Sequence, residues 1–111
     1  AKQYLINVGL WDAVAPKVIP TRSARAVLRA VESGSVDAGF VYRTDAKSSQ
    51  AAVVVYAVKS DFGPRIVYPV AVATNAPNFS GAVQFFDFIQ RSAAQQLFER
   101  LGFVLLTQPA A

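Results

Sequence analysis

The segment Ala51–Val58 most constrains the fold, because it is an unbroken apolar run, AAVVVYAV, that contains consecutive β-branched residues. A run of this length and composition is typical of a strand that is covered on both faces. A second apolar run, Ile66–Thr74, follows a turn-rich connector at Lys59–Arg65, and Pro69 within it predicts an edge strand or a bulge. Strands covered on both faces need helices on each side of a sheet, so the two runs favour an α/β fold.

Two helices are predicted before these runs. The first spans Lys2–Val14, where apolar residues recur at near-helical spacing and Gly9 weakens the middle. The second spans Arg22–Ser33, with Thr21 as its N-cap and Gly34 as the residue that ends it. No N-cap residue precedes the first helix, so we expect the chain to start partway through a larger fold.

Two further helices are predicted near the C-terminus. Ser80 caps a helix that runs to about Arg91, and Ser92 caps a second one over Ala93–Leu101, which Gly102 ends. These helices carry many large apolar side chains, and the remainder of the chain offers few faces to cover them. We therefore expect them to pack against a partner that this chain lacks.

Shorter strands are predicted at Lys17–Ile19, at Val36–Tyr42 and, as a strand or packed tail, at Phe103–Leu106. Gly39 lies inside the second of these, where a glycine is typical of close approach by another backbone or a ligand. The last residues, Gln108–Ala111, are expected to be a frayed natural end. Helices thus alternate with apolar strands, which predicts mixed sheets flanked by helices.

The chain has neither cysteine nor histidine, which excludes the catalytic mechanisms and metal sites that depend on a thiol or an imidazole. The seven carboxylates are scattered, and no spacing suggests a paired acid and base. Lys47 closes a predicted helical turn and stands beside Ser48 and Ser49, which is the one candidate Ser-Lys pair. That pair lies in an ordinary polar loop, so we predict that the chain is not an enzyme.

The chain carries 11 basic against 7 acidic residues, a weak preference for anions. The densest basic group is Arg22, Arg25 and Arg29, whose helical spacing favours a solvated helix face over a stripe of phosphate contacts. We therefore expect no nucleic-acid partner. No apolar run approaches the roughly 20 residues that span a bilayer, and the N-terminal residues lack the pattern of an export signal.

The order of several sequence blocks resembles the C-terminal half of the periplasmic molybdate-binding proteins of ABC transporters, in the type II periplasmic binding protein family. The blocks are AVAPKVIP at 13–20, RSARAVLRAVESG at 22–34, DAGFVY followed by RTDA at 37–46, IVYPVAV at 66–72 and SAAQQLFERLGF at 92–103. As a set, DAGFVY with TDA and YPVAV with AAQQLFERLGF are fairly specific. The resemblance covers essentially the whole chain.

This resemblance implies a two-lobed α/β protein that traps its ligand in the cleft between the lobes. Residues 1–65 would form a portion of the second lobe. Residues 66–111 would supply the return strand and C-terminal helices that pack toward the first lobe, which is absent here.

The resemblance also implies two oxyanion-binding residues. Ala24 stands where the family presents a backbone N–H at a helix start, and Tyr42 ends a strand and would offer its phenol O–H. Neutral donors of this kind hold a dianion without charged side chains. Three roles are open for Arg25 and Arg43, next to these two positions: tuning the field at the cleft, contact with a transporter subunit, and the one we favour, solvated surface charges.

The implied function is binding of molybdate or tungstate as the periplasmic solute-binding component of an ABC transporter, with a membrane permease as partner. No cofactor is implied, and the only metal is that of the anion held by Ala24 and Tyr42. Because the family's other donors have no counterpart here, the site of this chain is expected to be incomplete. The alternative is a structural fragment without ligand binding, which forms homo-oligomers through surface left by the missing lobe.

Overall fold

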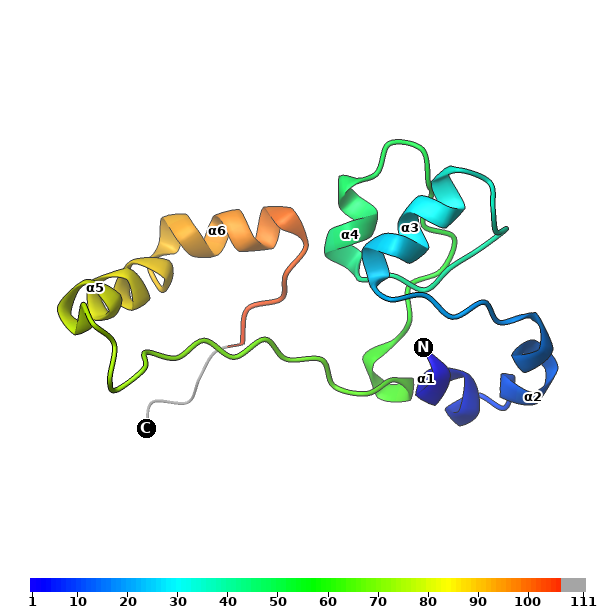
Figure 1. The fold of residues 1–111 in the computed structure, drawn as a ribbon, viewed down its shortest axis with the longest axis horizontal. Helices are drawn as coiled ribbons and strands as arrows, with labels where there is room; N and C mark the ends of the chain where they lie inside the picture. Colours follow the sequence, from blue (N-terminus) through cyan, green and yellow to red (C-terminus); the bar gives the residue numbers. More distant parts are fainter. Residues whose placement is uncertain (107–111) are drawn as a thin grey trace. The chain divides into compact units, whose positions relative to one another are not determined.

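The computed structural model describes residues 1–106, so the predicted frayed end at Gln108–Ala111 lies outside the described residues. The chain divides into two compact units, Ala1–Ile66 and the residues from Val67 onward, and each is described by itself (Figure 1). The assignment of residues 1–65 and 66–111 to parts of two lobes stays a prediction.

The first unit begins with two short helices in place of the single helix predicted over Lys2–Val14. Helix α1 spans Lys2–Asn7 and helix α2 spans Trp11–Val14, which continues into the 3-10 turn η1 at Ala15–Lys17. The interruption falls at Gly9, whose φ of 73° is the left-handed conformation that a helix cannot contain. The strand predicted at residues 17–19 is not formed, because Lys17 closes η1 and the extended backbone starts only at Val18.

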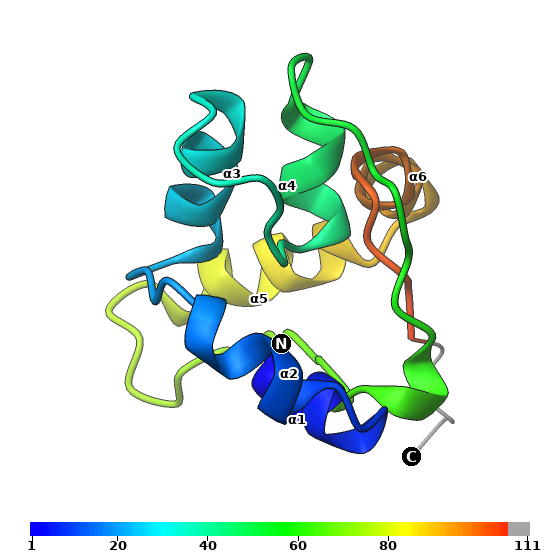
Figure 2. The same ribbon diagram turned by 90° about the vertical axis from the view of Figure 1, so that its right-hand side faces the viewer.

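Helix α3, Ala24–Glu32, packs beside helix α4, Arg43–Ser48, and Figures 1 and 2 both show the two helices side by side. The N-cap of α3 is Ser23 and not the predicted Thr21, because the Ser23 hydroxyl accepts a hydrogen bond from the Ala26 N–H at 3.2 Å. Thr21 lies one step too early, and its hydroxyl donates to the Ser23 carbonyl instead.

Gly39 lets the extended segment before α4 lie directly on α3. A Cβ atom at this position would collide with Cγ1 of Val27 and stand 3.2 Å from Cγ2 of Val31. The close approach expected at this glycine is confirmed, but it is made by two helix side chains and not by a second backbone or a ligand. This contact covers the same helix that contributes the buried Leu28.

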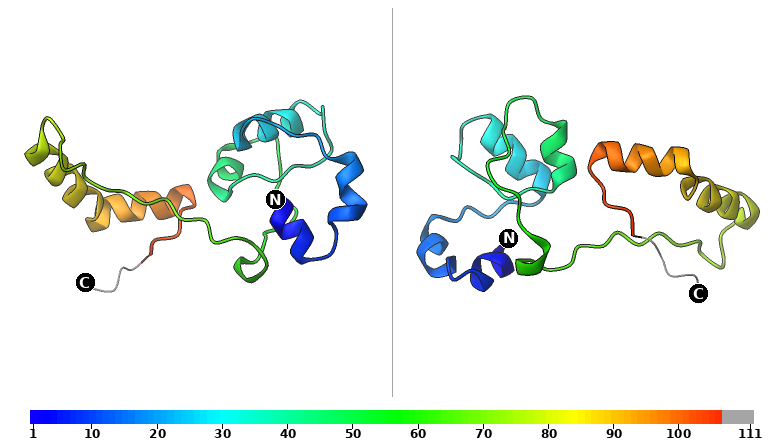
Figure 3. Two further views of the ribbon diagram at one scale, coloured as in Figure 1. Left: turned by 60° about the horizontal axis from the view of Figure 1, so that its bottom comes forward. Right: turned by 180° about the vertical axis from the view of Figure 1, so that it is seen from behind.

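The second unit contains helix α5, Phe79–Ile89, followed by helix α6, Ser92–Leu101 (Figure 3). Asn78 caps α5 by accepting from the Gly81 N–H at 3.0 Å, so the predicted cap Ser80 lies inside the helix.

For helix α6 the predicted end is correct and the predicted cap at its start is wrong. Helix α6 ends at Gly102, with φ of 103°, as predicted. Its N-cap is Arg91 without a side-chain bond, and the predicted cap, Ser92, is the first helical residue. Phe103 then packs edge-on against Phe98 and Tyr68, with ring centroids 5.8 and 6.1 Å apart.

The predicted strands are the main difference between sequence and structure. Among residues 1–106 no β-ladder is formed, so the segments 36–42, 51–58, 66–74 and 103–106 do not build the expected mixed sheets. Val53 and Val55 are 83% and 87% exposed, and the buried hydrophobic residues of the described chain are Leu5 and Leu28. A strand is held by hydrogen bonds to neighbouring strands, and within residues 1–106 none of these segments has a neighbouring strand to pair with.

A short 3-10 turn, η2 at Ser60–Phe62, follows the first apolar run and returns the chain to α1. The Asn7 side-chain amide donates to the Phe62 carbonyl at 3.0 Å. Tyr4 contacts Phe40, with ring centroids 6.0 Å apart, and shares a hydrogen bond with Tyr56. These contacts hold the ends of the first unit together. None of the helices in residues 1–106 is long and apolar enough to cross a membrane.

The hydrogen bond to Tyr56 raises the pKa of Tyr4 above its ordinary value, and Tyr56→Phe is expected to return that pKa toward normal. A raised folded-state pKa means that the contact stabilises the fold fully below the ordinary tyrosine pKa. The contribution is then lost as pH rises through the raised value. NMR titration of the tyrosine ring carbons measures the shift, with Tyr68→Phe in the second unit as control. An unchanged Tyr4 titration in Tyr56→Phe contradicts the contact.

Candidate functional site

Ala24 is the first residue of α3, and its position makes its backbone N–H available. The first intrahelical hydrogen bond runs from the Val27 N–H to the Ser23 carbonyl at 3.1 Å, and the Ser23 hydroxyl satisfies the Ala26 N–H. The N–H groups of Ala24 and Arg25 therefore precede the hydrogen-bonded part of the helix and point out of its start. The partial positive charge of the helix dipole lies at the same end, which favours an anion there.

Tyr42 is the residue directly before α4, with an extended backbone, and its side chain is half-exposed. Its carbonyl accepts the first hydrogen bond of α4 from the Ala46 N–H at 3.0 Å. The phenol therefore stands where the chain turns from the segment that lies on α3 into a new helix. A phenol O–H at such a place is a neutral donor with an apolar ring to hold it.

An ion pair links the starts of these two helices. Arg25 Nε lies 3.9 Å from Asp45 Oδ1, and the two side chains are 84% and 16% exposed respectively. Arg25 follows Ala24 at once, and Asp45 lies within the first turn after Tyr42. The structure thus brings together the helix starts that carry the two residues predicted for the site.

The ends of α3 and α4 are also joined, through a contact that the sequence analysis did not find. The Ser49 hydroxyl donates to Glu32, and its oxygen accepts from the Ala52 N–H at 3.0 Å. The Ser48 hydroxyl donates to the Asp45 carbonyl at 2.6 Å. Each hydroxyl has a single proton, which is already directed to an acceptor, so neither serine has the arrangement of a Ser-Lys nucleophile. The only signal for this link in the sequence was a carboxylate, Glu32, at the end of one helix and a hydroxyl, Ser49, at the end of the following helix.

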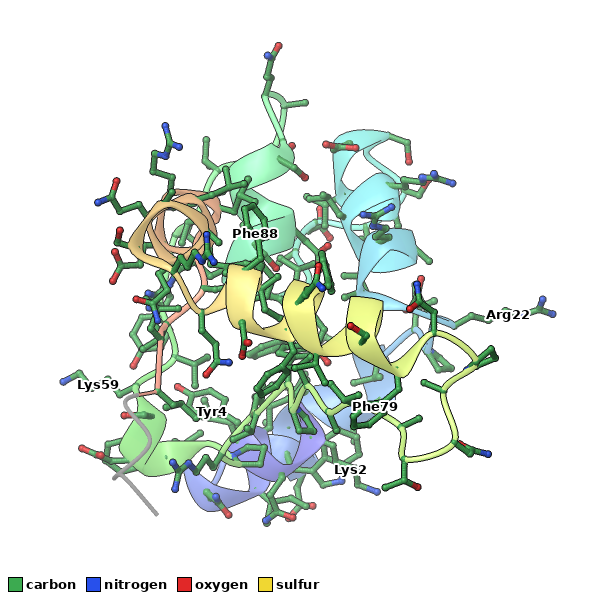
Figure 4. The ribbon with its side chains drawn as sticks, turned by 90° about the vertical axis from the view of Figure 1, so that its left-hand side faces the viewer. Lys2, Tyr4, Arg22, Lys59, Phe79 and Phe88 are labelled. Carbon is green, nitrogen blue, oxygen red and sulfur yellow. The ribbon has the colours of Figure 1, made fainter. Side chains whose placement is uncertain are left out.

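The basic residues around α3 do not form a stripe of equivalent groups. Arg22 extends outward from the segment before the helix (Figure 4), whereas Arg25 reaches across to Asp45. Arg22, Arg25 and Arg29 are exposed, as expected for a solvated helix face. Within residues 1–106 no three acidic, histidine or cysteine side chains gather in a group able to hold a metal ion.

Comparison with known proteins gives a family for this chain. Residues 1–104 match the family described as bacterial extracellular solute-binding protein. The chain is 37% identical over 102 residues to a putative ABC transporter substrate-binding lipoprotein of Bacillus subtilis (strain 168). It is 33% identical over 105 residues to the molybdate-binding protein ModA of Escherichia coli (strain K12).

The two relatives are longer than this chain. The matches cover 92% and 95% of the chain but 39% and 40% of the relatives, so the chain spans about two fifths of their length. Both relatives are named as binding proteins and neither as an enzyme.

Replacement of the α3 cap tests whether the helix start depends on Ser23. Ser23→Ala is expected to lower the free energy of unfolding by about 1 kcal/mol, because the Ala26 N–H loses its acceptor. Urea unfolding followed by circular dichroism measures the loss. Thr21→Ala is the matched control and is expected to change stability by less than about 0.5 kcal/mol. A larger loss in Thr21→Ala than in Ser23→Ala contradicts the assignment of the cap.

Proposed function

The chain belongs to the bacterial extracellular solute-binding proteins, and from this premise we propose that it contributes to the solute-binding component of an ABC transporter for molybdate or tungstate. The family membership supports the transport role, and the similarity to a molybdate-binding protein supports the choice of oxyanion. Binding and delivery to a membrane permease need no bond to be made or broken, so no cofactor is involved.

The proposed site uses the Ala24 N–H and the Tyr42 O–H as two neutral donors. A desolvated dianion is stable only when its oxygens are hydrogen-bonded, and donors at a helix start add a favourable dipole. The observation that carries this proposal is the Arg25–Asp45 contact, because it shows that the two donor-bearing helix starts lie next to each other. Two donors cannot surround a tetrahedral anion, so the remaining oxygens would be held by other groups.

We further propose that the type II two-lobed fold forms when the chain is combined with polypeptide of the kind that its longer relatives possess. Residues 1–65 then belong to the second lobe, and residues 66–111 supply the return strand and the helices directed to the first lobe. Two observations support this. The apolar runs are exposed and unpaired within residues 1–106, and the chain spans about two fifths of its relatives.

The proposed location is outside the cytoplasmic membrane, in the periplasm or tethered to the membrane surface. The family is described as extracellular, and one relative is named as a lipoprotein. The proposed protein partner is the permease of the same transporter.

A titration of the isotope-labelled chain with molybdate tests the site. We expect selective shifts of the Ala24 and Arg25 amide signals and weak affinity, with a dissociation constant on the order of millimolar, because only two donors are present. Tyr42→Phe is expected to weaken binding about tenfold through loss of one hydrogen bond to a charged group. Tyr68→Phe, in the second unit, is the matched control.

Three outcomes contradict this proposal. Unmoved Ala24 and Arg25 amides refute the site, and equal shifts with sulfate refute a selective one. Tight stoichiometric binding by a monomer refutes the expected incompleteness.

A second candidate function is self-association through the apolar run, favoured by the exposure of four consecutive residues, Val53–Tyr56. Neighbouring side chains of an extended segment point to opposite faces, so neither face is covered. An exposed, uncharged, β-prone segment without proline is prone to pair with a second copy.

Sedimentation velocity at increasing concentration tests self-association. The chain is expected to gain mass with concentration, and Val55→Lys is expected to stay monomeric because a charge in the run opposes pairing. Val104→Lys places the same charge on an exposed residue elsewhere and is expected to behave like the unaltered chain. A monomer mass at every concentration excludes this second function, as does equal loss of association in both variants.

A further inference from the structure

Asp45 is an unusual side chain for the neighbourhood of an anion site. It lies in the first turn of α4, where a carboxylate is favoured by the helix dipole, and it is largely withdrawn from solvent. The proposed donor Tyr42 directly precedes the same helix. An arriving oxyanion would therefore meet a fixed negative charge close to its own position.

The repulsion between such a carboxylate and a dianion is large enough to matter. At about 10 Å and low salt, one negative charge changes the affinity of a dianion on the order of fivefold, and burial of the carboxylate reduces the screening by water. A site that contains Asp45 therefore needs a compensating positive charge.

Arg25 is placed to supply that charge. Its Nε lies 3.9 Å from Asp45 Oδ1, while most of the guanidinium side chain faces water. An exposed ion pair of this geometry contributes little to stability. The pair matters more for the local electric field than for stability, because Asp45 alone is negative whereas Asp45 paired with Arg25 is neutral as a whole.

We propose that Arg25 raises oxyanion affinity by neutralising Asp45, and that it acts through this carboxylate without touching the anion. This inference rests on the proposed function, because it concerns the same site at the starts of α3 and α4. It gives the two charges a definite role: Asp45 favours the start of α4, and Arg25 removes the penalty that Asp45 imposes on the ligand.

The test measures molybdate affinity from the Ala24 and Arg25-position amide shifts in four variants at low salt. Arg25→Gln is expected to bind on the order of fivefold more weakly than the unaltered chain. Asp45→Asn is expected to bind as well as the unaltered chain or better. Arg25→Gln combined with Asp45→Asn is expected to recover to within about twofold, because the carboxylate that needed compensation is gone.

Arg29→Gln is the matched control, because it removes the same charge from the same helix but lies outside the pair. It is expected to stay within about twofold of the unaltered chain. Raised salt is expected to shrink the difference between Arg25→Gln and the unaltered chain, which a purely structural role for Arg25 would not produce.

The outcomes separate this inference from the proposed function. Equal weakening in Arg25→Gln and Arg29→Gln overturns the inference in favour of a net-charge effect. A combined variant as weak as Arg25→Gln overturns it in favour of direct contact between Arg25 and the anion. If the unaltered chain shows no amide shift at all, the proposed site fails, and the inference with it. If Asp45→Asn does not fold, Asp45→Ser takes its place in both the single and the combined variant, because a hydroxyl keeps a hydrogen-bond acceptor at the same position without the charge.

Discussion

Pairing of extended backbone is the constraint on which the rest of this structure depends. Each extended residue carries a donor and an acceptor that a neighbouring strand would satisfy, and residues 1–106 provide no such neighbour. The apolar run at 51–58 therefore stays exposed although its composition suits a sheet interior. The first unit is held together by its helices and their contacts. These are the packing of α3 side chains against Gly39, the cap at Ser23, and the hydrogen bond from the Asn7 side chain to the Phe62 carbonyl.

Local signals in the sequence predict the helices well, because a helix satisfies its own backbone. The left-handed ends at Gly34 and Gly102 follow from the absence of a Cβ atom, and α3, α5 and α6 lie close to their predicted ranges. The caps are less predictable, since Thr21 and Ser23 differ only in which backbone conformation the folded chain gives them. Strands are predictable as preferences only, because their formation depends on residues far away in the chain or outside it.

The candidate site, too, has a part that could be predicted from the sequence and a part that only the structure shows. Ala24 and Tyr42 were identified from a family resemblance, and no periodicity or spacing pointed to either. The Arg25–Asp45 pair was within reach of the sequence only as two opposite charges in the first turns of neighbouring helices. The sequence does not show that the Asp45 side chain is largely buried. The structure does, and the small exposed fraction of this carboxylate is what makes its charge important. The chain belongs to a family whose two compared members are longer, and it spans about two fifths of their length.

The contact between Gly39 and α3 has a consequence for sequence variation among relatives. The space that a side chain at position 39 would occupy is already filled by Val27, so the two positions share one fixed volume. A methyl group gained at 39 must be matched by a smaller side chain at 27, for example by valine becoming alanine. Positions 27 and 39 should therefore vary together across related proteins. Their covariation would record the docking of this segment on α3, even in relatives that share little else.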